Sequence, residues 1–248
     1  MTKITMIGAG HLASQMSIAL SKAGHVICQV YSRSEDSASH LSKKLNCPYT
    51  TDIKKLIPSD LAIIAVTDSA IQQLEKHIHF AKVHTSGTKA LNILNGNSIG
   101  VFYPLQTFSK NVKVDFSKIP ICIESENIEF TSLLKSIAKS ISNTVIEINS
   151  IQRRQLHLAA VFSCNFSNLM YSLSQEICVK NNISFELMHS LIKETAQKIQ
   201  YLKPQESQTG PASRRDYTII EEHLKMLSDD NEKQQLYKIL SNSIINRS

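Results

Sequence analysis

A short turn near the start of the chain carries residues of the kind that hold a phosphate group. It follows a largely apolar stretch, residues 4–7, and reads Gly8, Ala9, Gly10, His11, Leu12 and Ala13. Gly8 permits a tight turn out of a strand, and Gly10 lets the backbone approach a pyrophosphate without a Cβ in the way. Ala13 lets the next helix pack close to the strand, and the amino terminus of that helix offers unpaired N–H groups and a positive dipole end to an anion. The pattern predicts a dinucleotide site in which the backbone from Gly8 to Ala13 binds the pyrophosphate.

The residues after the second predicted strand, residues 26–31, indicate which dinucleotide binds. A site for NAD usually carries an acidic residue here, which accepts hydrogen bonds from the ribose hydroxyls. This chain instead has Ser32, Arg33 and Ser34, and a guanidinium flanked by two hydroxyls suits a 2′-phosphate. We therefore expect NADP (NADPH) as the cofactor. The alternative is that Arg33 is a solvated loop residue and that Glu35 binds the ribose.

Two further strand ends supply polar groups suited to nicotinamide chemistry. The apolar run 61–66 ends in Val66 and Thr67, which we expect to contact the cofactor. A later strand leads into His84 and Ser86, which are candidates to donate a proton to a carbonyl or an imine. The competing interpretation is that Ser86 or its neighbour caps a helix and that His84 is a buried, hydrogen-bonded residue.

Three polar residues lie along a long, largely apolar stretch with helical spacing, residues 152–180. Arg153, His157 and Asn165 are spaced at i, i+4 and i+12, and we expect them to share one face of the helix. On that face His157 would donate a proton, Asn165 would orient the substrate, and Arg153 would bind a substrate carboxylate through two hydrogen bonds. Alternatively, these polar groups pair with one another inside a dimer core.

A loop near the carboxyl terminus supplies one more cation. In this loop, residues 210–216, Arg214 follows a glycine and a proline, and it would position an anionic substrate or reach the active site of a partner subunit. The alternative is an ordinary ion pair of Arg214 with Asp216 that caps the following helix.

Strands and helices alternate through the first part of the chain and give way to helices alone at Ser150. Such alternation is typical of an α/β fold with a doubly wound parallel sheet, whose ligand lies outside the carboxyl ends of the strands. We expect a Rossmann-type NAD(P)-binding domain over residues 1–149 and an all-helical substrate and dimerisation domain over residues 150–248. Asp68 is a predicted helix N-cap, the alternative being that it contacts the nicotinamide ribose or the substrate. Asp229 is a predicted N-cap in a capping box with Glu232.

Several motifs occur in an order that extends over nearly the whole chain. After the glycine turn they are Val66-Thr67-Asp68, His84-Thr85-Ser86-Gly87, Tyr103-Pro104-Leu105-Gln106-Thr107-Phe108, His157-Leu158-Ala159-Ala160, Asn165-Phe166 and Gly210-Pro211-Ala212-Ser213-Arg214-Arg215-Asp216. Together they resemble a bacterial family of Rossmann-like proteins with a C-terminal helical domain of unknown function. That family is similar to pyrroline-5-carboxylate reductase, ketopantoate reductase and 6-phosphogluconate dehydrogenase, and the resemblance implies NAD(P) chemistry and a helical domain used for dimerisation. Two positions depart from the pattern: Tyr103 stands where the family more often has His, and Arg215 stands where Gly commonly follows the arginine.

The composition narrows the class of protein. Five cysteines without a close pair argue against a disulfide framework and a zinc site, and they favour the reducing cytoplasm. No apolar run approaches the roughly 20 residues of a membrane span, and no targeting segment precedes the first strand, so we expect a soluble, cytoplasmic protein. The net charge of +6 comes from scattered lysines and arginines, which favours small anions over nucleic acid as partners.

We therefore expect an NADP-dependent oxidoreductase that transfers a hydride between nicotinamide and a C=O or C=N group of a small anionic substrate. We expect no metal, no nucleic acid and no membrane partner, and we expect a homodimer formed through the helical domain. The competing hypothesis is a sensor or interaction protein that binds NADP(H) without turning over a substrate.

Overall fold

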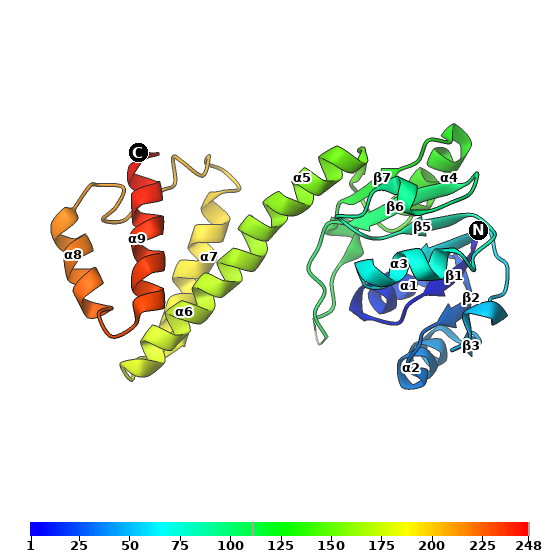
Figure 1. Ribbon diagram of the computed structural model, residues 1–248, viewed down its shortest axis with the longest axis horizontal. Coiled ribbons are helices and arrows are strands. Elements are labelled where there is room, and N and C mark those ends of the chain that lie inside the picture. The colour runs from blue at the N-terminus through cyan, green and yellow to red at the C-terminus, as the bar shows by residue number, and fades with distance from the viewer. Residues whose placement is uncertain (111, 248) are drawn as a thin grey trace. The chain divides into compact units, whose positions relative to one another are not determined.

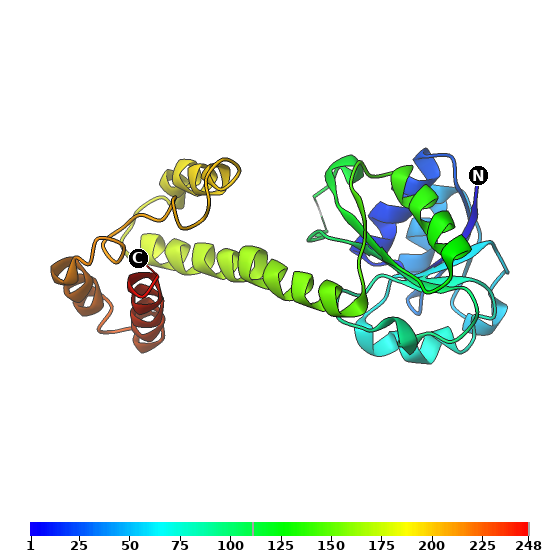
Figure 2. The ribbon, with the colours of Figure 1, turned by 90° about the horizontal axis from the view of Figure 1, so that it is seen from above.

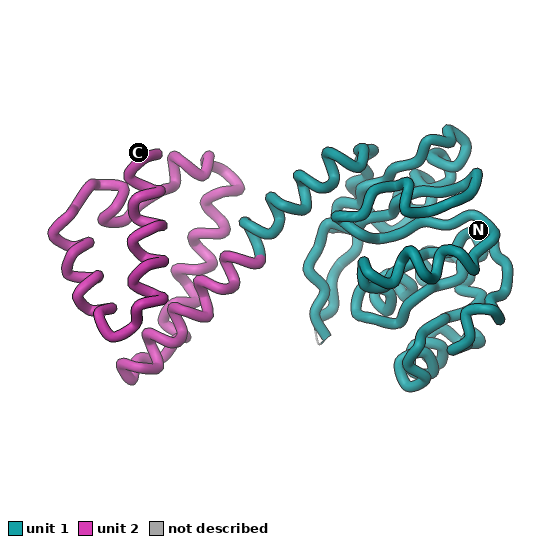
Figure 3. Tube along the Cα trace, in the orientation of Figure 1, with its two compact units in different colours: residues 1–164 teal, residues 165–248 magenta. Residues whose placement is uncertain are grey.

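The structure of the chain, a computed structural model, describes residues 1–110 and 112–247. The chain divides into two compact units, Met1–Cys164 and Asn165–Ser248, which Figure 3 shows in different colours. The first unit contains a sheet with helices on both faces, and the second consists of helices (Figure 1). The change from alternating elements to helices falls at Ser150, so the helix that begins there starts in the first unit.

Within the described residues the sheet has eight strands, in the order β3-β2-β1-β4-β5-β6-β7-β8. Neighbouring strands are parallel except for β6 and β7, which are antiparallel. The order 3-2-1-4-5-6 is that of a doubly wound nucleotide-binding sheet, whose crevice opens where the strand order reverses, between β1 and β4. The predicted α/β fold is thereby confirmed. The strands are β1 (Lys3–Ile7), β2 (Val26–Tyr31), β3 (Tyr49–Thr50), β4 (Leu61–Ile64), β5 (Lys82–His84), β6 (Ile99–Pro104), β7 (Ile121–Glu124) and β8 (Val145–Glu147).

Alternate residues of the central strands enter two apolar cores, one on each face of the sheet. Leu61 and Ile63 of β4 belong to one core, Ala62 and Ile64 belong to the other, and all four are 0% exposed. A strand buried on both faces needs apolar residues at every position, which explains the unbroken apolar run in the sequence. Figure 2 shows helices on opposite sides of the sheet: α1 (His11–Lys22), α2 (Glu35–Leu45) and α4 (Ile128–Lys139) pack on the first core, and α3 (Asp68–Glu75) packs on the second.

After the sheet, the chain continues as a long helical stretch with a wider turn in its middle. Helix α5 (Ser150–Ala160) passes into a π-helical segment, Val161–Phe166, and then into α6 (Ser167–Lys180). The apolar spacing predicts a single α-helix here, because one π-helical turn leaves little trace in such a pattern. The remaining elements of this region are a 3-10 turn (Phe185–Met188), α7 (His189–Lys198), α8 (Tyr217–Met226) and α9 (Asn231–Ile245).

The predicted cap of the last helix is wrong by one residue. Asp230 is the N-cap of α9, and its carboxylate accepts a hydrogen bond from the Lys233 amide at 3.0 Å. Asp229 instead forms an ion pair with Lys180 of α6. Adjacent aspartates are equally good caps by residue type, so the backbone conformation decides between them.

Two absences hold for the described residues. No helix in them is long and apolar enough to cross a membrane. They also contain no group of three His, Cys, Asp or Glu side chains placed to hold a metal ion. All five cysteines, which lie within these residues, are free thiols.

Candidate functional site

The glycine turn lies where the ends of three strands meet. Gly8 directly follows β1, and its N–H donates a hydrogen bond of 2.7 Å to the carbonyl of Tyr31 at the end of β2. The φ angle of Gly8 is +116°, and a Cβ there would lie 2.2 Å from the carbonyl oxygen of Ala65, which follows β4. Both the conformation and the close approach therefore require glycine at this position.

Helix α1 presents an uncapped amino terminus beside this turn. Gly10 is the N-cap residue, no side chain accepts from the first amides of the helix, and the first turn contains no acidic residue. A Cβ on Gly10 would have no other protein atom within 4 Å. The first amides have no capping side chain and there is room beside Gly10, which suits an anion that approaches the backbone closely.

A pocket of about 390 Å³ opens in front of these amides. Its wall combines the turn with residues from the ends of β2 and β4 and from one face of α3. The structure thus brings together most of the residues predicted to bind the cofactor, which are Gly8, Ala9, Gly10, His11, Leu12, Ala13, Ser32, Arg33, Val66 and Thr67.

Arg33 and Glu35 differ in their availability to a ligand in this pocket. Arg33 lines the pocket, is exposed, and forms no ion pair among the described residues. Glu35 is the first residue of α2, and its carboxylate accepts a hydrogen bond of 3.2 Å from the Tyr49 hydroxyl. Ser34 is not among the residues that line the pocket, and its hydroxyl caps α2 by accepting from the Ser37 amide.

The end of β4 leads into α3 through Thr67. Thr67 is the N-cap residue of α3 but makes no side-chain cap hydrogen bond. The prediction that Asp68 is the N-cap is wrong, because Asp68 lies inside the helix and its carboxylate accepts from the Thr88 hydroxyl. This bond ties α3 to the loop after β5.

His84 is fully buried at the end of β5. Its Nδ1 accepts from the Ser86 amide at 3.1 Å, and its Nε2 donates to the Ala90 carbonyl at 3.3 Å. Burial and, after it, the nearby Arg153 charge lower the pKa of His84 to about 4, so the ring is neutral at pH 7. Proton donation by His84 would require one of these hydrogen bonds to break, and the contacts are those of the competing interpretation, a hydrogen-bonded buried histidine.

Ser86 shapes the loop after β5. Its hydroxyl accepts from the amides of Thr88 at 3.1 Å and Lys89 at 2.9 Å. No helix begins at this point, so the hydroxyl stabilises a turn and does not cap a helix. The predicted role of Ser86 in proton donation stays a prediction.

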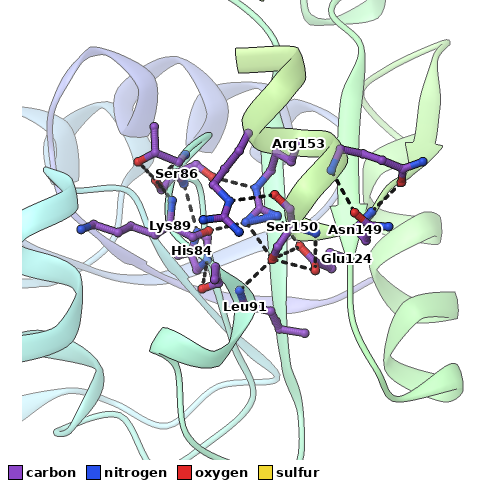
Figure 4. A network of polar contacts seen from close by, with 12 residues as sticks. His84, Ser86, Lys89, Leu91, Glu124, Asn149, Ser150 and Arg153 are labelled. Carbon is purple, nitrogen blue, oxygen red and sulfur yellow. Dashed lines mark hydrogen bonds and ion pairs between the residues drawn. The ribbon is translucent and has the colours of Figure 1, made fainter. Parts of the chain in front are cut away.

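Arg153 anchors α5 to this loop and to β7, as Figure 4 shows. Its side chain is 0% exposed and is paired with Glu124 of β7. Its Nε donates to the Ser86 carbonyl at 3.1 Å, and another of its nitrogens donates to the Lys89 carbonyl. The Glu124 carboxylate also accepts from the amide and the hydroxyl of Ser150 at 2.7 and 2.8 Å.

The contacts of Arg153 contradict the substrate-binding role that we predicted for it. A guanidinium without exposed surface, held by a carboxylate and two carbonyls, does not face a ligand. Burial lowers the pKa of Arg153, and the Glu124 charge opposes that shift. We therefore assign Arg153 the role of holding α5 in place.

His157 lies one helical turn after Arg153 and meets a residue from the sheet. Its Nδ1 is 3.2 Å from the Tyr103 hydroxyl, and Gly87 packs against both side chains. Both Tyr103 and His157 are half-buried. Sequence reasoning identified His157 but assigned no role to Tyr103, although its unusual place in the Pro-Leu motif was the available signal.

Two of the predicted residues lie in the second unit. Asn165 is exposed and lies in the π-helical segment, so the α-helical spacing that grouped it with Arg153 and His157 does not hold there. Arg214 is exposed, and it forms no ion pair with Asp216 in the part of the chain that is described; Asp216 caps α8 alone, accepting from the Ile219 amide. The roles of Asn165 and Arg214 stay predictions.

Arg215 explains one departure from the family pattern. Its φ angle is +57°, in the left-handed region that favours glycine. A glycine at this position would adopt the same turn without strain. Arg215 thus adopts the left-handed conformation here although it is not a glycine.

The comparisons show the family to which the chain belongs. The chain is a member of the family that carries the domain of unknown function DUF2520, which matches residues 119–244, and a Rossmann-like domain matches residues 1–110. Among solved structures it is similar to a protein from Bacteroides fragilis named "putative NADP oxidoreductase". The two are 45% identical with a TM-score of 0.91, over 99% of this chain and 98% of that chain.

More distant structures share the fold. A 1-pyrroline-5-carboxylate reductase from Streptococcus pyogenes is 16% identical with a TM-score of 0.65, over 99% of this chain and 97% of that chain. An imine reductase from Myxococcus stipitatus, in complex with NADP+, is 12% identical with a TM-score of 0.66, over 98% of this chain and 92% of that chain. Among curated proteins, none matches the chain.

Proposed function

We propose that the protein is an oxidoreductase that binds NADP(H) in the pocket between β1 and β4. The observation that carries this proposal is that the uncapped amino terminus of α1 and Arg33 line one pocket. These groups suit the pyrophosphate and the 2′-phosphate of one dinucleotide. The name of the Bacteroides fragilis protein, which is 45% identical, supports the same cofactor and the same class of reaction.

The proposed reaction is reduction of a C=O or C=N group in a small anionic substrate. Bound NADPH supplies the hydride in chemistry of this kind. The chain's own contribution is to hold the dinucleotide by the backbone of the glycine turn and to supply a proton from the carboxyl ends of β5 and β6. The net charge of +6 favours an anionic substrate.

Replacing Arg33 by alanine is expected to weaken binding of NADPH by about 10- to 100-fold, because a charge-assisted hydrogen bond to the 2′-phosphate is lost. Binding of NADH should change little, since it has no such phosphate. Fluorescence titration of both dinucleotides measures the difference. Lys54→Ala, which removes the same charge from an exposed site outside the pocket, serves as the control. If Arg33→Ala binds both dinucleotides as the unchanged protein does, Arg33 does not bind the phosphate.

Turnover distinguishes the oxidoreductase from the NADP(H) sensor. We expect the protein to oxidise NADPH in the presence of at least one member of a panel of small keto acids and cyclic imines bearing a carboxylate. Absorbance at the nicotinamide band follows this reaction. Tight NADPH binding without turnover across the whole panel would favour the sensor.

We further propose that the helical region pairs with a second copy of the chain. In residues 165–247, the buried apolar side chains are few, namely Cys178, Ala212 and Ile220. Large apolar side chains of the same region are exposed, including Leu187 (66%), Leu191 (61%) and Ile239 (63%). Exposed apolar surface on this scale is typical of a permanent interface between subunits.

Light scattering after size-exclusion chromatography is expected to give twice the mass of one chain. The double variant Leu187→Glu and Leu191→Glu should shift the protein to the monomer, because it places charges on the apolar surface. Ile128→Glu, at an apolar residue that is 84% exposed in the first unit, should leave the dimer intact. A monomer at micromolar concentration in the unchanged protein would contradict the proposal.

A further inference from the structure

Tyr103 and His157 form a hydrogen-bonded pair at the carboxyl end of β6. The Tyr103 Oη lies 3.2 Å from His157 Nδ1, and the two rings meet edge to face with centroids 6.2 Å apart. Strand β6 is parallel to β5, and β5 is parallel to β4. The pair therefore lies at the edge of the sheet where nucleotide-binding folds hold their ligands.

Gly87 makes room for this pair. A Cβ on Gly87 would lie 2.6 Å from His157 Nδ1 and 3.0 Å from Tyr103 Cζ. Gly87 does not have a positive φ angle, so close packing and not backbone conformation is the reason for glycine here. Any larger residue would separate the two rings or displace the loop.

The helix that carries His157 is fixed at the adjacent turn. Arg153 lies four residues before His157, and its Nε donates to the carbonyl of Ser86, the residue before Gly87. The ion pair of Arg153 with Glu124 holds the same helix to β7. These contacts determine the position of His157 relative to the loop and to Tyr103.

The surroundings keep the Tyr103 hydroxyl protonated. Burial raises the pKa of Tyr103 to about 12, the Cys122 and Cys164 thiols add to this shift, and the Arg153 charge opposes it. A phenol of this kind holds its proton at neutral pH and gives it up when a stronger base develops beside it. The oxygen or nitrogen of a C=O or C=N group becomes such a base as its carbon is reduced.

We propose that Tyr103 is the catalytic proton donor of this protein and that His157 is its relay, an assignment that rests on the proposed oxidoreductase function. Tyr103 is half-buried and paired with a half-buried histidine, whereas His84 has no exposed surface and both of its ring nitrogens are hydrogen-bonded. The Tyr103–His157 pair is thus the more accessible acid at this edge of the sheet.

The proton balance of this step is simple. The Tyr103 O–H bond breaks, and an O–H or N–H bond forms on the substrate while its carbon gains the hydride that NADPH supplies. His157 then passes a proton from Nδ1 to the Tyr103 phenolate, and solvent water returns a proton to the imidazole. The substrate gains one hydride and one proton in total.

Tyr103→Phe tests this assignment because it removes only the hydroxyl. We expect turnover to fall about 100-fold or more, while NADPH affinity stays within about twofold of that of the unchanged protein. NMR of labelled histidines gives a readout that does not depend on activity. The nitrogen chemical shift of His157 Nδ1 is expected to change when its hydrogen-bond partner is lost. Tyr201→Phe, at a side chain that is 87% exposed, should change neither quantity.

Each outcome separates this assignment from the function on which it rests. If the unchanged protein turns over a substrate and Tyr103→Phe does so at the same rate, Tyr103 is not the proton donor, but the oxidoreductase function stands. If the chemical shift of His157 Nδ1 is the same in both proteins, the pair does not interact in solution, and the relay fails. If the unchanged protein binds NADPH but reduces no substrate in the panel, both the function and the assignment are overturned.

Discussion

Replacing Arg153 by methionine is expected to lower the free energy of unfolding of the first unit by about 3 to 5 kcal/mol, because it leaves a largely buried carboxylate without its partner. Methionine keeps most of the side-chain volume but donates no hydrogen bond. The Glu124 carboxylate, which is 14% exposed, would lose its ion pair. The carbonyls of Ser86 and Lys89 would lose donors as well.

Urea unfolding followed by circular dichroism measures this effect. Because the chain has two compact units, the transition of the first unit has to be resolved from that of the second. Arg154→Met, at the adjacent exposed residue, is the matched control and should change the free energy by less than about 0.5 kcal/mol. An Arg153→Met protein within about 1 kcal/mol of the unchanged protein would show that Arg153 is not the anchor of α5.

Replacing Gly10 by alanine is expected to weaken NADPH binding by about 100-fold, because a methyl group would keep the pyrophosphate from the first amides of α1. The same change should leave stability within about 1 kcal/mol. Gly10 has an ordinary negative φ angle of −72°, and its Cβ would meet no protein atom within 4 Å. A loss of affinity would therefore report on the ligand and not on the protein.

Gly24, just after the other end of the same helix, is a control site at which alanine should affect stability and not NADPH binding. Its φ angle is +90°, and a Cβ there would also meet no atom within 4 Å. Gly24→Ala should lower the free energy of unfolding by about 1 kcal/mol, through backbone strain alone, and should leave NADPH affinity unchanged. If Gly10→Ala and Gly24→Ala bind NADPH equally well, the phosphate does not lie at the amino terminus of α1.

The fold was largely predictable because its signals are local in the sequence. The run from Leu61 to Ile64 is apolar at every position, and the structure buries it on both faces of the sheet. The glycine turn follows β1, Arg33 follows β2, and Val66 and Thr67 follow β4. The pattern of apolar residues in the sequence locates the ends of these strands. Strands of a parallel sheet end at one edge, so the residues at those ends lie close together.

The other features of the candidate site depend on contacts between residues that are far apart in the sequence. Residue types and spacing do not show such contacts. From the sequence alone, Arg153 is a charged residue on a predicted helix. Its partners Glu124 and Ser86 lie 29 and 67 residues away in the sequence. Tyr103 is 54 residues from His157, and neither residue type alone indicates the pair. The small size of Gly87 is explained only once both rings are placed beside it.

The proposed NADP(H) site is tested most simply by the equilibrium binding of NADPH and NADH to the unchanged protein, measured by titration at one ionic strength. We expect saturable binding of one NADPH per chain at the α1 turn, with NADH at least about tenfold weaker because it lacks the 2′-phosphate that Arg33 would bind. Absence of binding by either dinucleotide, or equal affinity for both, would contradict this proposal.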